Sequence, residues 1–196
     1  MRKAKIQRKT TETDVSVEIN LDGRGEGDID TSIPFLDHML NLFSRHGLLA
    51  LTIRGRGDIT IDAHHLVEDV GICLGQAVRK ALGEREGINR YGTAVVPMDE
   101  SLCSVTMDLS GRPYLVWRAK LGTARIGEFD PALLREFFKS LSDHGGITLH
   151  ISLNYGTNVH HMAEAMFKAF ARAFREAVAI DGRIEGVPST KGSLDV

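Results

Sequence analysis

The sequence has little of what marks membrane, secreted or nucleic-acid-binding proteins. No long hydrophobic run occurs, and the first ten residues are basic without an apolar stretch, so we expect neither a membrane span nor a signal peptide. The formal net charge is only −2, and no basic block interleaved with aromatic residues occurs, which argues against a nucleic-acid surface. We therefore expect a cytoplasmic protein.

Cysteine is equally scarce. Cys73 and Cys103 stand apart, one in a helical pattern and one in a strand pattern, so we expect buried thiols rather than a disulfide. The chain also lacks a GxSxG element, a Cys/His nucleophile pairing and a dinucleotide-binding fingerprint. Its 196 residues, 42% hydrophobic and 26% charged, suit one globular domain or two small fused halves.

What the chain does contain is a repeated cluster of histidine and glutamate. The segment IDAHHLVEDVGICLGQAVRKAL carries this HHxxE spacing first, and NVHHMAEAMFKAFARAFREAV carries it again. The residues concerned are His64, His65 and Glu68 in the first copy, and His160, His161 and Glu164 in the second. Two copies of a ligand pattern in one chain indicate a duplicated scaffold with a two-metal site.

Two further blocks repeat in the same order. Residues 11–25 match residues 99–113, so that Glu12 falls on Glu100, and residues 35–53 match residues 133–151 without gaps. We therefore predict an internally duplicated chain. Its parts are a first half-repeat at 1–90, a second half-repeat at 91–185, and a C-terminal tail at 186–196 that contacts the substrate.

The spacing of hydrophobic residues predicts the same order of elements in each half: strands, a short helix, a strand and a long helix. Apolar residues from Val15 to Leu21 alternate with polar neighbours, as in a half-buried strand, and further strands are expected over 48–54 and 147–153. The prediction is an α+β fold in which each half has a β-sheet covered on one face by helices.

The helix boundaries follow from capping residues. Ser32 and Asp130, each closely followed by proline, are suited to start the short helices. Gly47 and Gly145 are suited to a left-handed position at their ends. The predicted caps of the long helices are Asp62 and Asn158, and their predicted ends lie near Gly83 and Asp181–Gly182.

The spacing within each long helix predicts which ligands act together. Residues four apart share a helix face, so His64 lies beside Glu68, while His65 points about 100° away. Each long helix is therefore predicted to serve two ions. Imidazole and carboxylate suit manganese, iron, zinc or nickel. The alternative, that these are solvated first turns of two helices, is weakened by the second copy at the matched place.

Other residues extend the candidate site. His38 on the first short helix and its counterpart Glu136 are candidate ligands, although such a histidine is more often a core residue. His46 and His144 end the short helices, where a cationic histidine is favoured, so a structural role competes for both. Basic residues that could meet an anion, each otherwise a solvated charge, are Arg90, Arg112, Lys168 and Lys191, the last within Ser189-Thr190-Lys191-Gly192.

Several motifs, in order over nearly the whole chain, carry a resemblance to one enzyme family. They are IPFLDHMLNLFSRHG, DAHHLVEDVGICLGQA, GINRYG with PMDE, DLSGRPYLV, NVHHMAEAMFKAFARA and PSTKG. With these motifs the chain resembles the imidazoleglycerol-phosphate dehydratases of histidine biosynthesis. The resemblance implies two similar α+β halves, a homo-oligomeric shell of 24 subunits, and a site with two Mn²⁺ ions whose ligands come from neighbouring subunits.

The resemblance also implies roles for individual residues. One ion would be held by His38, His64, Glu68 and His160, and the other by His65, His161, Glu164 and the residue at 136. Many members have histidine there, within EHF, where this chain has Glu136 within REFF; Glu136, a water or His144 could complete the shell. Glu12 corresponds to the acid–base glutamate. The implied phosphate ligands are Arg90, Arg112, Lys168, Ser189, Thr190 and Lys191, and the implied substrate contacts also include His38, His46, His64, His65, Glu68 and His160.

The implied reaction converts imidazoleglycerol phosphate to imidazoleacetol phosphate and water. It breaks a C–H bond that no carbonyl acidifies, which explains a need for cations at the imidazole ring and a positioned carboxylate. Two alternatives stay open. One is a dimetal hydrolase, in which a metal-bound water attacks. The other is a non-catalytic metal-binding shell protein, in which Glu12, Arg112 and Lys191 would not matter.

Overall fold

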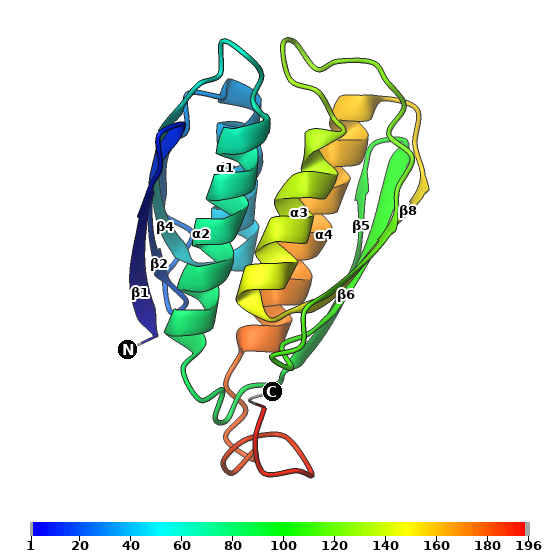
Figure 1. The fold of residues 1–196 in the computed structure, drawn as a ribbon. Helices are drawn as coiled ribbons and strands as arrows, with labels where there is room; N and C mark the ends of the chain where they lie inside the picture. The colour runs from blue at the N-terminus through cyan, green and yellow to red at the C-terminus, as the bar shows by residue number, and fades with distance from the viewer. Residues whose placement is uncertain (1, 195–196) are drawn as a thin grey trace.

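The computed structural model describes residues 2–194, and its two halves repeat one arrangement (Figure 1). The first half contains β1 (Lys3–Lys9), β2 (Thr13–Asn20), β3 (Gly27–Asp30), α1 (Pro34–Gly47), β4 (Ala50–Gly57) and α2 (His64–Leu82). The second contains β5 (Tyr91–Met98), β6 (Ser101–Asp108), β7 (Tyr114–Arg118), α3 (Leu133–Gly145), β8 (Thr148–Tyr155) and α4 (Val159–Val178). No helix in this part of the chain is long and apolar enough to cross a membrane.

The two sheets have the same topology, which confirms the predicted duplication and the α+β class. Their strand orders are β1-β2-β4-β3 and β5-β6-β8-β7. In both sheets the last pair, β3 with β4 and β7 with β8, is parallel and the other pairs are antiparallel. Val17 pairs with Ile53 in the first sheet as Val105 pairs with Ile151 in the second. Matched positions of the repeat therefore occupy matched places.

The helices lie between the two sheets (Figure 1). Helix α2 packs on β1 and β2, and α4 packs on β5 and β6, while α1 contacts α4 and α2 contacts α3 across the boundary between the halves. The α1–α4 contact is aromatic, with the Phe43 ring centroid 5.0 Å from that of Phe170. The α2–α3 contact is closer, because Cβ atoms on Gly71 and Gly75 would each lie 2.7 Å from a carbonyl oxygen of α3. The core is thus continuous through both halves.

The predicted strands and thiols are confirmed in substance. Val15, Val17 and Ile19 of β2 are fully buried, as the alternation predicted. Cys73 and Cys103 are buried and free. Burial raises the pKa of the Cys73 thiol to about 11 and that of Cys103 to about 12, so neither is a reactive thiolate.

The starts of the short helices differ from the prediction. Ile33 precedes α1 and Ala132 precedes α3, and neither Ser32 nor Asp130 caps its helix through its side chain. The Asp130 carboxylate instead accepts from Ala132 N at 2.9 Å, in a turn before the helix. Ser32 has a positive φ of 65°, outside the extended conformation typical of a cap.

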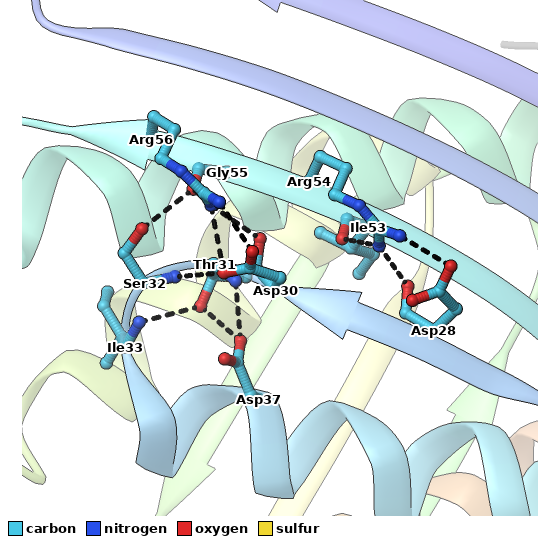
Figure 2. A network of polar contacts seen from close by, with 10 residues as sticks. All are labelled: Asp28, Asp30, Thr31, Ser32, Ile33, Asp37, Ile53, Arg54, Gly55 and Arg56. Atoms are coloured by element: carbon cyan, nitrogen blue, oxygen red, sulfur yellow. Dashed lines mark hydrogen bonds and ion pairs between the residues drawn. The ribbon is translucent and has the colours of Figure 1, made fainter.

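A polar network fixes the start of α1 (Figure 2). Asp37 Oδ1 accepts hydrogen bonds from Thr31 N at 2.8 Å and from Thr31 Oγ1 at 2.6 Å. Beside it, Arg56 pairs with Asp30 at 2.5 Å and Arg54 with Asp28 at 2.6 Å across the parallel strands β3 and β4. These exposed ion pairs contribute little to stability. The Thr31–Asp37 contact matters more, because it orients the first turn of α1, which carries His38.

The ends of helices α1, α3 and α4 also differ from the prediction. Gly47 and Gly145 are the last helical residues, and the left-handed residues are the next ones, Leu48 (φ 53°) and Gly146 (φ 64°). Both glycines are in tight places, because a Cβ on either Gly47 or Gly145 would lie 3.0 Å from the side chain two residues on. Helix α2 ends before Gly83 as predicted, but α4 ends at Val178.

Packing of the following segment explains the early end of α4. Arg90 N donates to Ala177 O at 2.9 Å and Asn89 N donates to Ala179 O at 2.8 Å, while Ile180 forms a bridge with Ile88. These bonds draw the chain away from the helical path before Asp181 is reached.

Asn158 caps α4 as predicted, accepting from His160 N and His161 N. Asp62 performs a similar task one residue further out, accepting from His64 N at 2.8 Å, while Ala63 holds the cap position of α2.

Candidate metal centre

The first histidine–carboxylate cluster joins the starts of α1 and α4. His38 Nε2 and His160 Nε2 each lie 3.1 Å from Glu164 Oε1. The Phe35 ring packs edge-on against the His160 ring at a centroid distance of 5.4 Å. Three donor groups therefore converge within 4.8 Å of one another, from elements that the duplication places in different halves.

Glu164 is the centre of this cluster and is held ionised. It is only 8% exposed, and burial alone would raise its pKa. Hydrogen bonds from Lys168, His38 and His160 outweigh burial and lower the pKa to about 2. Lys168 Nζ lies 2.6 Å from Glu164 Oε2, so this predicted phosphate ligand forms an ion pair with the carboxylate.

A second cluster gathers at the start of α2. His65 Nδ1 lies 3.1 Å from Asp58 Oδ2 and 3.8 Å from Glu12 Oε2, and the three groups could hold a cation. The hydrogen bond to Asp58, followed by the charge of Glu12, raises the pKa of His65. The predicted acid–base residue Glu12 thus lies beside a predicted metal ligand.

A matching contact forms at the start of α4. His161 Nδ1 lies 2.7 Å from Glu100 Oε2, in the turn between β5 and β6. The bond to Glu100 raises the pKa of His161, and the same bond, with backbone N–H donors, holds the pKa of Glu100 far below its usual range. Glu100 is the repeat counterpart of Glu12.

Adjacent histidines diverge as the helical period predicts. The ring centroids of His64 and His65 lie 6.1 Å apart with planes at 85°, and those of His160 and His161 lie 6.3 Å apart at the same angle. Each pair therefore faces two different places, which suits a helix that serves two ions.

The two predicted ligand sets are not assembled within one chain. Glu164, rather than His64 and Glu68, lies beside His38 and His160, and over residues 2–194 neither His64 nor Glu68 joins a cluster of three ligands. Glu136, which stands where many family members have histidine, pairs with Arg135 at 3.1 Å. His64, Glu68 and Glu136 occupy in one helix pair the places that His160, Glu164 and His38 occupy in the other. The chain thus presents partial sites.

The predicted phosphate ligands other than Lys168 lie at a different place. Arg90 pairs with Asp108 at 2.7 Å and donates to Pro188 O at 2.9 Å, and Arg112 lies 3.9 Å from Asp108. Pro188 of the tail therefore contacts Arg90, and Asp108 lies between the two arginines; residues 195–196 of the predicted tail lie outside the described residues. Within the tail Lys191 N donates to Ser189 Oγ at 3.2 Å, Thr190 and Lys191 are exposed, and Leu194 is buried near Gly111.

The tail and the histidine clusters lie at opposite ends of the helix layer (Figure 1). His160 starts α4, and the tail follows its last turn. Helix α4 has 20 residues. A helix of that length spans about 30 Å. A small phosphorylated molecule cannot reach both places in one chain, so a site that uses both needs a second subunit.

His46 lies between these places and corrects an expectation. The helix terminus favours a cationic ring, but burial, followed by the positive charges of Lys168 and Arg172, lowers the pKa of His46. These surroundings disfavour the cationic ring that the helix terminus would favour. His144, its counterpart, has Nδ1 3.0 Å from Ser140 O in the preceding turn.

Sequence reasoning missed three acidic residues of this region. Glu100 could have been found through the repeat, because it aligns with Glu12. Asp58 lies in the loop after β4 and has no acidic counterpart, and Asp108 is recognisable only once it is seen to hold Arg90.

The donor atoms fit a first-row divalent ion. Imidazole nitrogen and carboxylate oxygen are suited to manganese, iron, zinc and nickel, and the described residues hold no thiolate ligand in either cluster. Each cluster offers three groups, fewer than the six ligands of an octahedral ion, which leaves positions for ligands from another subunit or from a substrate.

Comparison with known proteins decides the family. A model described as imidazoleglycerol-phosphate dehydratase matches residues 31–174, most of the chain. The chain belongs to the imidazoleglycerol-phosphate dehydratase family. It is 65% identical over 195 residues to a family member from Syntrophus aciditrophicus, with 99% of each chain covered. It is 58% identical over 193 residues to one from Geobacter metallireducens, with 98% of this chain and 99% of that one covered.

Solved dehydratase structures share the fold. The enzyme from Staphylococcus aureus superposes with a TM-score of 0.83 at 39% identity, covering 91% of this chain and 99% of that one. The enzyme from Pyrococcus furiosus, solved in complex with (S)-C348, gives a TM-score of 0.83 at 38% identity, covering 96% and 99%.

Proposed function

We propose that this chain is a manganese-dependent imidazoleglycerol-phosphate dehydratase of histidine biosynthesis. It converts imidazoleglycerol phosphate to imidazoleacetol phosphate and water in the cytoplasm. Family membership supports the reaction. The convergence of His38 and His160, proposed for one ion, with Glu164, proposed for the other, supports a metal centre at this end of the helices.

Two Mn²⁺ ions fit the donor set. One would be held by His38, His64, Glu68 and His160, and the other by His65, His161, Glu164 and Glu136. When bound, the ions supply Lewis acidity to the nitrogens of the substrate's imidazole ring, favouring its electron-rich form.

Glu12 moves the proton. Its side chain is 55% exposed and 3.8 Å from His65 Nδ1, close to a ligand and open to a substrate. Its carboxylate removes hydrogen from the carbon next to the phosphate-bearing carbon, while the hydroxyl on the carbon next to the ring leaves as water. The resulting enol takes a proton at that ring-linked carbon and becomes the ketone.

Basic residues anchor the phosphate. Arg90 and Arg112, beside the tail with Ser189, Thr190 and Lys191, supply charged donors, and Lys168 supplies another near the ligands. The tail and the candidate metal ligands lie at opposite ends of the helix layer. We therefore propose that each site combines residues of at least two subunits of a closed assembly of 24. Remote binding energy at the phosphate then orients the reacting carbons.

The direct test is turnover. Purified protein with Mn²⁺ should produce the ketone from imidazoleglycerol phosphate, and Glu12→Gln should abolish most of it. Glu18→Gln is a matched control, because Glu18 is an exposed glutamate of β2, 3.8 Å from Lys5 and remote from the histidines. Release of inorganic phosphate instead of ketone would indicate the hydrolase, and metal uptake without turnover would indicate the shell protein.

Metal removal gives a second test. A chelator should abolish activity and also shift the assembly to smaller particles, because the ligands are shared between subunits. Size-exclusion chromatography with light scattering measures the particle mass. Particles that stay assembled and active after metal analysis shows full depletion would contradict the proposal.

A further inference from the structure

Two of the histidines at the helix starts have one ring nitrogen occupied by a carboxylate. His161 Nδ1 faces Glu100 at 2.7 Å, and His65 Nδ1 faces Asp58 at 3.1 Å. An ionised carboxylate only accepts hydrogen bonds, so Nδ1 must carry the hydrogen in both rings. In the neutral ring the lone pair is then on Nε2. His38 and His160 differ, because they direct Nε2 itself at a carboxylate.

Glu100 is held by more than its histidine. Its Oε1 accepts from Asn158 N at 2.8 Å, from Ser101 Oγ at 2.9 Å and from Thr157 N at 3.2 Å. Asn158 in turn caps α4 through His160 N at 2.9 Å. The carboxylate is therefore fixed relative to the turn that carries His161. Its other oxygen, Oε2, points at His161 Nδ1.

Asp58 is placed by the end of β4 and is half-buried, with a side chain 23% exposed. Its Oδ1 is buried without a hydrogen-bond partner among residues 2–194, while Oδ2 faces His65. A buried carboxylate oxygen without a hydrogen-bond partner lowers stability. The placement of Asp58 is therefore not explained by its own hydrogen bonding, and its contact with His65 is the feature to explain.

We propose that Asp58 and Glu100 are positioning residues that fix His65 and His161 with Nδ1 protonated, so that Nε2 of each ring is presented to a metal ion. The proposal rests on the proposed metal centre. The physical gain is familiar for histidine ligands: a carboxylate on the far nitrogen sets the tautomer, limits ring rotation and strengthens the ligand. The two halves of the chain reach this result with acids from different places.

The test uses Glu100→Gln, Glu100→Ala, Asp58→Asn and Asp58→Ala in the full chain. Asp99→Asn is the matched control, because Asp99 Oδ2 lies 3.9 Å from His161 Nδ1, beyond hydrogen-bond range, and its side chain is 71% exposed. Mn²⁺ affinity and stoichiometry are measured by calorimetry. The histidine tautomers are measured by solid-state ¹⁵N NMR of the metal-free protein, with signals assigned by loss in His65→Gln and His161→Gln.

The alanine variants should weaken binding of one ion about 10- to 100-fold, while Asp99→Asn stays unchanged. Glu100→Gln should weaken it as well, because an amide whose oxygen accepts from Asn158 N turns its NH2 group toward His161 Nδ1 and favours the Nε2–H ring. Wild-type rings should show the Nδ1–H form, and the alanine variants a mixture. Glu100→Gln guards against misfolding, because its amide oxygen can still accept from Asn158 N. Unchanged affinity in both alanine variants, or Nε2–H rings in the wild type, would overturn the proposal. A wild type that shows Nδ1–H rings yet binds no Mn²⁺ would instead overturn the metal centre.

Discussion

Glu12 and Glu100 occupy the same turn in the two halves and differ in what their carboxylates do. Glu100 accepts bonds from His161, Asn158, Thr157 and Ser101. Glu12 lies 3.8 Å from His65, and Asp58 takes the place nearest that ring. The two copies therefore differ in geometry: Glu100 is tied to its histidine and to three further donors, while Glu12 stands farther from His65, which suits the acid–base role proposed for it.

The helix pairs differ in the same way. Between α1 and α4, Glu164 joins His38, His160 and Lys168 in one network. Between α3 and α2, Glu136 turns to its neighbour Arg135, and Ile72 stands where α4 has Lys168. The residues of one helix pair are therefore joined in a network, and the matched residues of the other pair are not.

The largest expected effect separates the two glutamates. Glu12→Gln should lower kcat by roughly 10²- to 10⁴-fold, the typical contribution of a positioned acid–base group, without changing Mn²⁺ affinity. Glu100→Gln should weaken Mn²⁺ binding and leave kcat near wild type at saturating metal. Steady-state kinetics at several metal concentrations make the comparison. Equal kcat losses for the two variants at saturating metal would break the assignment of separate roles.

The next effect compares the two helix pairs without metal. Glu164→Gln leaves Lys168 without its ion-pair partner in a mostly buried place, so it should lower the free energy of unfolding by about 1–3 kcal/mol. Glu68→Gln, the matched position of α2, should change it by less than about 0.5 kcal/mol. Denaturant unfolding of the metal-free protein measures both. Similar losses at the two positions would show that both networks are assembled.

A smaller effect concerns Glu136, the candidate ligand at the position where many family members have histidine. Glu136→Ala should weaken binding of one Mn²⁺ while the other stays bound, as metal analysis after dialysis would show. Two ions at full occupancy would mean that a water or His144 completes the shell.

The smallest effect follows from pH. The pKa of His161 is raised by Glu100, so the stability from this contact is fully present below the ordinary histidine pKa of about 6.5 and is lost as the pH rises through the raised value. Because the pKa of Glu100 is lowered, its own contribution persists down to strongly acidic pH. The Tm difference between metal-free wild type and Glu100→Gln should therefore be largest below about pH 6.5 and should shrink as the pH rises above it. A constant difference would argue against charge in the contact.

Sequence pattern predicted much of this arrangement for physical reasons. The helical period placed His64 and His65 on different faces, and the repeat placed matched ligands on matched helices. Helix boundaries and side-chain roles that depend on tertiary contacts could not be predicted from the pattern. The early end of α4 depends on Arg90 bonding Ala177 O, and the role of Asp58 depends on a loop conformation. Neither contact leaves a periodic signal.

Subunit complementation tests the shared site most directly. Glu12→Gln lies at the histidine end of the chain and Lys191→Ala in the tail, so each variant alone should be nearly inactive. After metal removal, mixing and reassembly with Mn²⁺, random assembly should make roughly one site in four intact if the two residues come from different subunits. Recovery of about a quarter of wild-type activity is the predicted result. No recovery from a mixture shown by mass spectrometry to contain both variants in one particle would contradict it.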